Sequence, residues 1–289
     1  MNINENILCN YVKDLLFVTD LDGTLLNSQG VLSDFSVGVI NSAIDYGVKF
    51  TFATGKSYQT VEKEVSKLNI KIPCITYDGA CINNKDGRII EYNTVDTNSL
   101  NAIINSVYKT LTSFLVYCII DGKERILWSK SKVNSYVKMY FINRKNDDRF
   151  LEVSSINEYY CGNILFIAFL DSLENVNKIK MKLVELGIKD IHINQDAYIK
   201  SMYWLKVKNI NANKGYAIKK IKESLNSKYI VSFGNDTNDI DMFNVSDYNL
   251  CVCNSNDKIK KLSSSIIESN NDDGVARFII RLLHLNNKM

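Results

Sequence analysis

The sequence predicts an α/β fold with a parallel sheet, interrupted by an inserted α+β domain. Short apolar runs alternate with amphipathic helical segments in the first and last parts of the 289-residue chain, which is typical of right-handed βαβ units. The middle of the chain instead shows strands, aromatic residues and hairpin turns. The length also exceeds the roughly 100–200 residues of a typical domain, so we expect two domains.

The first part of the chain predicts three strands and two helices. Continuous apolar or alternating runs place strands at 15–19, 48–52 and about 74–77. Ser33 is a candidate N-cap for a helix that ends at Gly47, and Ser57 begins a second helix that carries Val61, Val65 and Leu68.

The middle and the end of the chain differ in style. Strands are expected at 88–92, 114–120 and 164–170, helices near 100–108 and 173–186, and a hairpin turn at Asp121-Gly122. From residue 214 the βαβ pattern returns, with a helix to about 225, strands at 229–233 and 249–253, and a final helix at 274–285. We therefore assign residues 1–83 and 204–289 to the α/β domain and 84–203 to the insert.

Composition excludes several classes of protein. The chain is 46% hydrophobic and 23% charged, and its net charge of +3 comes with no stripe of Lys and Arg that would favour a nucleic-acid partner. No apolar stretch approaches the ~20 residues that span a bilayer, so no membrane association is expected. The first residues lack the pattern of a signal peptide, and the seven cysteines show no CxxC spacing. We expect a cytoplasmic protein with reduced thiols, either a monomer or a homodimer.

Polar side chains gather where the predicted strands end. Asp20 and Asp22 follow the first strand, Thr54 and Gly55 follow the second, and the segment 234–239 follows the strand at 229–233. Ligands of open parallel sheets bind beyond the carboxyl ends of the strands. Two carboxylates two residues apart repel each other unless a cation is near, and a mixed Asp/Asn set of oxygen ligands favours Mg²⁺.

This set of residues predicts phosphoryl-transfer chemistry. One Asp can attack phosphorus to give an aspartyl-phosphate, and the second can act as the acid and then the base. Lys214 and the hydroxyl of Thr54 would stabilise the charge on the transferring phosphoryl oxygens. Each segment alone is weak evidence: DxDG also occurs in calcium loops, although Thr24-Leu25-Leu26 interrupts the ligand spacing that such a loop needs.

The conjunction of motifs resembles a known family. The segment Asp20-Leu21-Asp22-Gly23-Thr24 is similar to the first signature of the haloacid dehalogenase-like superfamily, and three further segments resemble its other motifs: Ala53-Thr54-Gly55-Lys56, Asn213-Lys214-Gly215 and Gly234-Asn235-Asp236-Thr237-Asn238-Asp239. The segment 269–276 and the position of the insert resemble the Cof-type subfamily with its class IIB cap. The resemblance implies a three-layer Rossmann-like core with an α+β cap that selects the substrate.

The resemblance also implies roles for individual residues. Asp20 would be the nucleophile and a metal ligand, and Asp22 the general acid/base with its backbone carbonyl on the metal. The phosphoryl group would be held by Thr54, Gly55, Lys214 and Asn238. The Mg²⁺ site would be completed from among Asn235, Asp236 and Asp239, and the resemblance does not decide which of them touches the metal.

Three positions depart from the pattern of the family. Asn235 stands where the family usually has Asp, and Lys56 where it commonly has Arg. Lys keeps the positive charge but loses the planar fork of donors. Tyr77-Asp78-Gly79-Ala80 takes the place of the usual Asn-Gly-Ala turn, for which a structural role is the favoured interpretation.

The predicted function is a magnesium-dependent phosphomonoester hydrolase for a small phosphorylated metabolite, with sugar phosphates favoured by the resemblance. Two alternatives stay open. A phosphotransferase or mutase would hand the phosphoryl group to another hydroxyl, and a non-catalytic sensor would only bind a phosphorylated ligand. The intact Asp20, Asp22 and Lys214 argue against the sensor.

Overall fold

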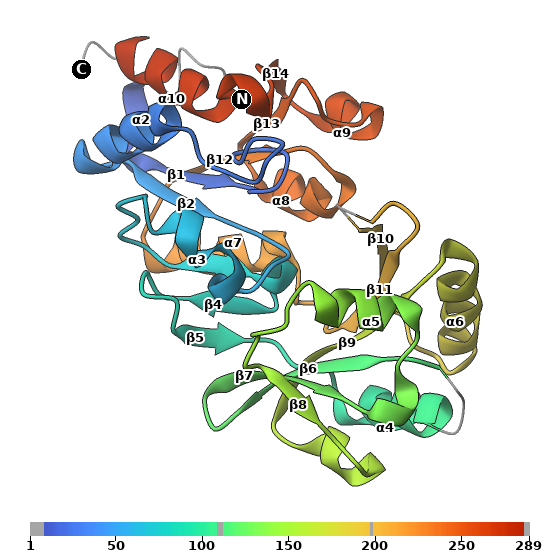
Figure 1. Ribbon diagram of the computed structural model, residues 1–289. Helices are drawn as coiled ribbons and strands as arrows, with labels where there is room; N and C mark the ends of the chain where they lie inside the picture. Colours follow the sequence, from blue (N-terminus) through green and yellow to red (C-terminus); the bar gives the residue numbers. More distant parts are fainter. Residues whose placement is uncertain (1–8, 109–111, 197–198, 286–289) are drawn as a thin grey trace. The chain divides into compact units, whose positions relative to one another are not determined.

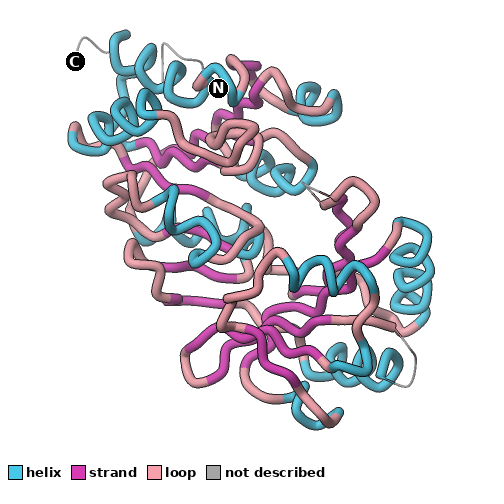
Figure 2. The backbone as a smooth tube through the Cα atoms, viewed as in Figure 1, coloured by secondary structure: helices cyan, strands magenta, loops and turns pink. Residues whose placement is uncertain are grey.

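A computed structural model describes residues 9–108, 112–196 and 199–285 (Figure 1). The chain divides into two compact units, one formed by residues 1–92 with 211–289 and the other by residues 93–210. The strands of the first unit form two sheets and those of the second unit form one (Figure 2). We call the first unit the core and the second unit the insert, and describe each by itself.

The core contains a five-stranded parallel sheet in the order β14-β13-β12-β1-β2. Its strands are β1 (Leu15–Thr19), β2 (Lys49–Phe52), β12 (Tyr229–Gly234), β13 (Tyr248–Val252) and β14 (Ser265–Ile267). A parallel bridge between Ala53 and Ile75 joins the end of β2 to a small antiparallel sheet. That sheet consists of β3 (Cys74–Thr76), β4 (Cys81–Asn83) and β5 (Ile89–Tyr92).

Alternate side chains of β1 show why helices cover both faces of the sheet. Leu15 and Phe17 pack in one apolar cluster with α2 (Asp34–Asp45), α3 (Tyr58–Val65) and α10 (Gly274–Leu285). Leu16 and Val18 pack in another with α7 (Lys214–Ser224), α8 (Ile240–Val245) and α9 (Asp257–Leu262). Successive strand residues point to opposite faces, so a strand that is apolar throughout requires cover on both sides. The predicted three-layer α/β core is confirmed.

The insert contains a six-stranded sheet in the order β10-β11-β9-β6-β7-β8. Its strands are β6 (Leu115–Ile120), β7 (Lys123–Trp128), β8 (Phe150–Glu152), β9 (Asn163–Asp171), β10 (Ile191–Gln195) and β11 (Tyr203–Lys208). Its helices are α4 (Thr97–Tyr108), α5 (Ser135–Ile142) and α6 (Leu173–Glu185). As predicted, Asp121 and Gly122 form a hairpin turn, with φ of 51° and 73° between β6 and β7.

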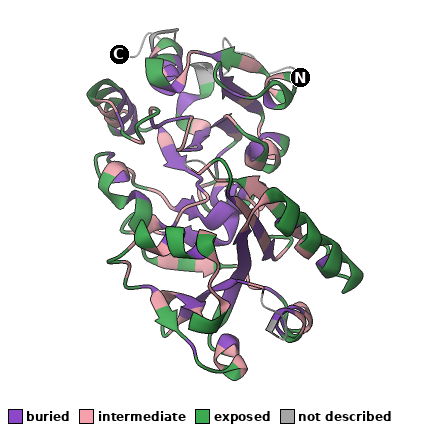
Figure 3. Ribbon diagram, turned by 45° about the vertical axis from the view of Figure 1, so that its right-hand side comes forward, coloured by how far each residue is buried: buried purple, intermediate pink, exposed green. Residues whose placement is uncertain are grey.

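The two faces of the insert sheet differ in chemistry. One face packs against α4 and α6 through mainly aliphatic residues such as Val116, Ile167 and Leu205, together with Phe169. The other carries an aromatic group in which the Tyr117 ring stacks on Phe166 at 4.2 Å and the Tyr117 hydroxyl lies 2.8 Å from that of Tyr140 on α5. Buried residues concentrate on the strands in Figure 3. Tyr117 therefore belongs to the packed interior of the insert.

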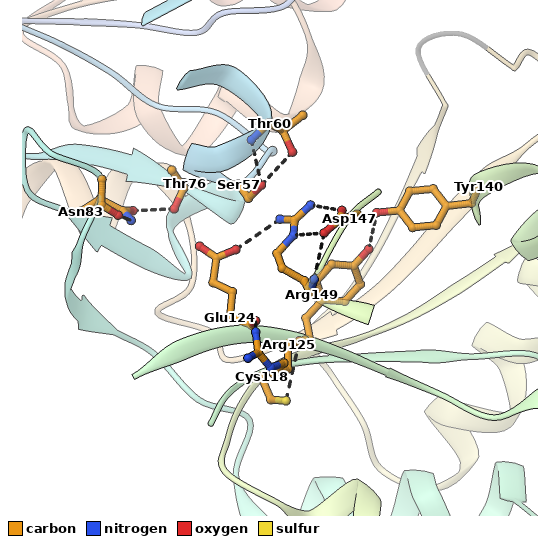
Figure 4. Close-up of polar contacts among 12 residues, drawn as sticks. Ser57, Thr60, Thr76, Asn83, Cys118, Glu124, Arg125, Tyr140, Asp147 and Arg149 are labelled. Carbon is orange, nitrogen blue, oxygen red and sulfur yellow. Dashed lines mark hydrogen bonds and ion pairs between the residues drawn. The ribbon is translucent and has the colours of Figure 1, made fainter. Parts of the chain in front are cut away.

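A buried arginine links the β7 strand to the loop before β8. Arg149 is 5% exposed and donates to both carboxylate oxygens of Asp147, and its Nη1 lies 3.2 Å from Glu124 Oε2 (Figure 4). These three charged side chains, which we call the Arg149 cluster, satisfy one another inside the unit.

The boundaries of the insert differ from the predicted 84–203. The unit begins at residue 93, nine positions later, because β5 pairs with β4 and so belongs to the core. It ends at residue 210, seven positions later, because β11 pairs with β9 and β10 in the insert sheet. Strand pairing sets both boundaries, and pairing between distant segments is not encoded in local composition.

Candidate active site

The carboxyl ends of β1, β2 and β12 bring the predicted site residues together in the core. The backbone N–H of Asp20 donates to the carbonyl of Phe233 at 2.9 Å, and that of Ala53 donates to Thr19 at 2.9 Å. In the parallel sheet, Thr19 pairs with Phe52 on one side and with Phe233 on the other. This register places the segments 20–24, 53–56 and 234–239 at one edge of the sheet. This arrangement is the expected position for a ligand site in an open parallel sheet.

Lys214 forms the centre of the site. Lys214 is the first residue of α7 and is 1% exposed. Asn213, the N-cap of this helix, accepts a hydrogen bond from the Tyr216 N–H. The Lys214 Nζ lies 2.6 Å from Asp20 Oδ1 and 2.7 Å from Asp239 Oδ1. We call this arrangement of Asp20, Lys214 and Asp239 the Lys214 cluster. Its cation is enclosed between two carboxylates that are themselves almost fully buried.

The cluster has more negative charge than Lys214 alone can neutralise. Burial raises the pKa of Asp20 to about 8, with Asp239 adding to the rise and Lys214 opposing it. Burial alone would lower the pKa of Lys214, but Asp20 and Asp239 together raise it above its usual value, so Lys214 remains protonated. A site with this excess of buried negative charge is suited to a cation.

The two oxygens of Asp20 are used differently. Oδ1 accepts from Lys214, whereas Oδ2 makes no hydrogen bond to the described part of the chain. The side chain is held rigidly by one oxygen, and the other remains available to attack or to bind a cation. Asp20 is 5% exposed, so little of its side chain is accessible to solvent.

Asp22 lies in a more open place than Asp20. Its carboxylate is 32% exposed and pairs with Lys56 Nζ at 2.6 Å. Lys56 follows the turn at Thr54 and Gly55, and its backbone N–H donates to the hydroxyl of Thr54 at 3.2 Å. The substitution of Lys for the usual Arg therefore still places a cation on Asp22, through a single ammonium contact. Thr54 itself is 1% exposed.

The three candidate residues for completing a metal site have separate surroundings. Asp239 is fully buried, with Oδ1 on Lys214 and Oδ2 accepting from the backbone N–H groups of Asn235 and Asp236. The Asp236 carboxylate is exposed and accepts from the Thr237 N–H and from the side chain of Asn256. Hydrogen bonds within the chain engage both carboxylates, and contact of either residue with a metal stays a prediction.

Asn235 is the remaining candidate. A Cβ built on Gly23 would lie 2.5 Å from Asn235 Nδ2, so the amide group lies directly against the loop that carries Asp20 and Asp22. The side chain of Asn235 makes no hydrogen bond to the described residues. A side-chain rotation would turn its oxygen toward the same place. The described residues contain no group of three or more His, Cys, Asp or Glu side chains that could hold a metal ion.

Asp78 is a site residue that sequence reasoning did not place here. Its carboxylate accepts from Asn238 Nδ2 at 3.3 Å, so Asn238, predicted to hold phosphate, also contacts this residue. Asp78 lies in a turn directly after β3, where the predicted strand to Tyr77 ends at Thr76 because Tyr77 and Asp78 both have positive φ. The departure from the usual Asn-Gly-Ala turn was its only signal in the sequence.

Comparison with known proteins identifies the family. The model of the haloacid dehalogenase-like hydrolases matches residues 17–279. The chain belongs to this family. It is 26% identical over 285 residues to the 5-amino-6-(5-phospho-D-ribitylamino)uracil phosphatase YwtE of Bacillus subtilis, covering 91% of this chain and 96% of that protein. The predicted resemblance to haloacid dehalogenase-like phosphatases of the Cof type is confirmed.

Solved structures agree with the family assignment. The crystal structure of TM0651 from Thermotoga maritima is similar with a TM-score of 0.74 and 25% identity, covering 92% of this chain and 96% of that one. A subclass IIB sugar phosphatase, BT4131, shares the fold at 16% identity, with a TM-score of 0.69 and coverage of 92% and 98%. This haloacid dehalogenase-like hydrolase is an enzyme, a phosphatase that acts on small phosphorylated substrates. None of its described helices is long and apolar enough to cross a membrane.

Proposed function

We propose that this phosphatase hydrolyses the phosphomonoester of a small metabolite in a Mg²⁺-dependent reaction in which Asp20 is the nucleophile. The observation that carries the proposal is the Lys214 cluster: Asp20 is buried at the end of β1, held by Oδ1 and uncommitted at Oδ2. An immobilised carboxylate with one available oxygen is suited to attack on phosphorus.

The reaction proceeds in two steps, in which Asp20 and Asp22 are the reacting residues of the protein. Asp20 Oδ2 forms a bond to phosphorus while the bond to the ester oxygen breaks, and Asp22 gives its proton to the departing oxygen. Asp22 then takes a proton from water, whose oxygen bonds to phosphorus and releases Asp20 and inorganic phosphate. The partial exposure of the Asp22 carboxylate supports this role, because leaving group and water must both reach it.

The phosphoryl group would be held by Thr54, Gly55 and Lys214, with Asn238 at the side. Lys214 supplies the full positive charge that stabilises the transferring oxygens, and its clamp between Asp20 and Asp239 removes the cost of ordering it during the reaction. Thr54 supplies a hydroxyl from a turn that is fixed by its backbone hydrogen bonds to Ile75 and Asp78.

The Asp20 carboxylate, the backbone carbonyl of Asp22 and the amide oxygen of Asn235 form a donor set that fits Mg²⁺. All three are oxygen ligands, and burial together with the nearby charge of Asp239 raises the pKa of Asp20, so a cation beside this carboxylate would favour its ionised form. When bound, the ion would screen the charge between the attacking carboxylate and the phosphate. We leave Asp236 and Asp239 out of the ligand set because their carboxylates are engaged elsewhere.

The substrate class follows from the relatives as a proposal. YwtE is named for a substrate in which a phosphorylated ribityl chain is attached to a uracil, so phosphate esters of sugars and polyols are the first candidates. The insert would act as the cap that selects among them. The thiols of six cysteines are free, which supports the expected reducing, cytoplasmic location; these are Cys74, Cys81, Cys118, Cys161, Cys251 and Cys253.

A panel of phosphorylated metabolites tests the proposal. Sugar phosphates, polyol phosphates and 5-amino-6-(5-phospho-D-ribitylamino)uracil are assayed for phosphate release with Mg²⁺ and with EDTA, beside Asp20→Asn. We expect turnover that requires Mg²⁺ and is abolished in the variant. Mg²⁺-dependent turnover that survives Asp20→Asn would exclude Asp20 as nucleophile. Transfer products formed with a second sugar present would favour a phosphotransferase, and tight binding without turnover would favour a sensor.

A further inference from the structure

The turn between β3 and β4 holds three consecutive residues in the left-handed region. Tyr77, Asp78 and Gly79 have φ of 53°, 54° and 95°. Glycine adopts this region freely, but each non-glycine residue there costs roughly 1 kcal/mol or more. Backbone of this kind persists only where the surroundings hold it.

Two segments of the active site hold the turn in place. The backbone N–H of Tyr77 donates to Lys56 at 3.0 Å, and that of Asp78 donates to Thr54 at 2.9 Å. On the opposite side, a Cβ on Gly79 would lie 2.2 Å from the backbone carbonyl of Asn213, directly before Lys214. The turn is therefore packed between the phosphate-binding turn and the start of α7.

The Asp78 carboxylate points into this junction. It is buried, at 6% exposure, and Oδ1 accepts from Asn238 Nδ2 at 3.3 Å. A Cβ on Gly55 would lie 3.0 and 3.1 Å from its two oxygens, so only glycine at position 55 leaves ordinary space for it. Asp78 also interacts electrostatically with Lys214. One side chain thus lies beside Gly55, accepts a hydrogen bond from Asn238 and interacts electrostatically with Lys214.

A carboxylate beside a phosphate-binding turn has two physical effects. Its hydrogen bond orients Asn238, and its backbone fixes the carbonyl of Thr54. Its charge also repels a phosphate dianion, by an amount that at separations of several ångströms is worth about 1 kcal/mol even in highly screened surroundings. The same charge would weaken the binding of substrate and of the inorganic phosphate that is released.

We propose that Asp78 is a positioning residue of this phosphatase, whose carboxylate ties Asn238 to the Thr54–Gly55 turn and whose charge speeds the departure of inorganic phosphate. The proposal rests on the proposed function of the site. It assigns to the Tyr77–Gly79 turn a role in turnover, in addition to the structural role expected from its sequence.

Two variants separate the effect of the Asp78 charge from that of its whole side chain, and a third variant serves as a control. Asp78→Asn keeps an acceptor and a residue type that tolerates positive φ but removes the charge, whereas Asp78→Gly removes the side chain and relieves the strain. Asp121→Asn is the matched control, because Asp121 also has positive φ (51°) but lies exposed in a hairpin turn of the insert. The readouts are kcat, KM, the Kd of inorganic phosphate by calorimetry with Mg²⁺ present, and Tm.

Asp78→Asn is expected to bind inorganic phosphate at least about threefold more tightly, with KM lowered in parallel. Asp78→Gly is expected to lose roughly tenfold in kcat with its Tm preserved, because Asn238 and the Thr54 turn lose their common partner. Asp121→Asn should change neither the Kd of inorganic phosphate nor kcat.

Unchanged phosphate binding and kcat in both Asp78 variants, together with an active wild type, would overturn this inference alone. A wild type that neither hydrolyses any phosphomonoester nor binds phosphate would overturn the proposed function and this inference together.

Discussion

The core and the insert each bury one cation between two carboxylates, and the two clusters differ in how completely their charges are satisfied. In the Arg149 cluster the guanidinium donates to both oxygens of Asp147 and also reaches Glu124 (Figure 4). In the Lys214 cluster a single ammonium serves Asp20 and Asp239, and Asp20 Oδ2 is left without a hydrogen bond in the described structure. The planar fork of Arg can satisfy a carboxylate that the point charge of Lys cannot.

The pKa values of Asp20 and Asp147 differ in the same sense. Burial raises the pKa of Asp20 to about 8, and Lys214 only partly opposes the rise. Burial would also raise the pKa of Asp147, but its hydrogen bonds and ion pair with Arg149 lower that pKa below the usual value. A buried carboxylate whose pKa its partner lowers is suited to a structural role, whereas one whose pKa is raised in spite of its partner is a candidate for reactivity.

The largest expected effect is on activity, from replacing the cation of the Lys214 cluster. Lys214→Met should lower kcat/KM about a thousandfold, because the positive charge on the transferring phosphoryl oxygens is lost. Rates are normalised to the folded fraction from circular dichroism, since two buried carboxylates also lose their partner. A variant that retains kcat/KM within tenfold of the wild type would remove Lys214 from the reaction.

The same substitution in the Arg149 cluster should act on stability instead. Arg149→Met leaves Asp147 and Glu124 without their buried partner, and we expect the free energy of unfolding to fall by about 3 kcal/mol. Urea unfolding measures the loss, with Lys123→Met on the exposed start of β7 as the control. The folded fraction should keep kcat/KM within about threefold. Wild-type stability in Arg149→Met would show that apolar packing replaces the cluster.

The affinity for Mg²⁺ should respond to position 235 and be insensitive to position 236. Asn235→Asp adds a carboxylate beside the loop of Asp20 and Asp22, and calorimetry should show Mg²⁺ binding about tenfold tighter in the absence of substrate. Asp236→Asn should change the Kd by less than about twofold, because that side chain is exposed and bound to Asn256. The reverse ranking would place the third ligand at Asp236.

The smallest effect expected is a pH dependence of stability with opposite signs in the two clusters. Because the pKa of Asp20 is raised, the folded protein keeps a proton that the unfolded chain loses between about pH 4 and pH 8, so this contribution falls as pH rises. Because the pKa of Asp147 is lowered, its contribution is present above about pH 4 and lost below it.

Thermal unfolding in EDTA tests the two signs. Between pH 6 and pH 8 the wild type should lose a few degrees of Tm relative to Asp20→Asn. Below pH 4 it should lose Tm relative to Asp147→Asn. Parallel pH profiles in wild type and Asp20→Asn would show that Asp20 titrates normally.

Much of the core could be predicted because its signals are short-range. The apolar run 15–19 became β1, and Ser33 and Ser57 cap α2 and α3 as expected, each accepting a hydrogen bond from a nearby backbone N–H. The insert was predicted less completely. Its β8 and α5 were not predicted, and the predicted boundary at residue 203 separated most of β11 from the strands with which it pairs, because antiparallel pairing joins segments whose local patterns are weak.

The sequence by itself determined that this chain is an α/β phosphatase with Asp20, Asp22 and Thr54 at strand ends and Lys214 at the start of a helix, since motif order and strand periodicity are local properties. Only the tertiary structure decided that Asp239 holds Lys214, that Asn235 and not Asp236 faces the loop of Asp20, and that Asp78 enters the site. Lys214 lies 194 positions from Asp20 in the chain. Which side chains meet across such separations depends on how the sheet and its helices pack, and no local pattern records it.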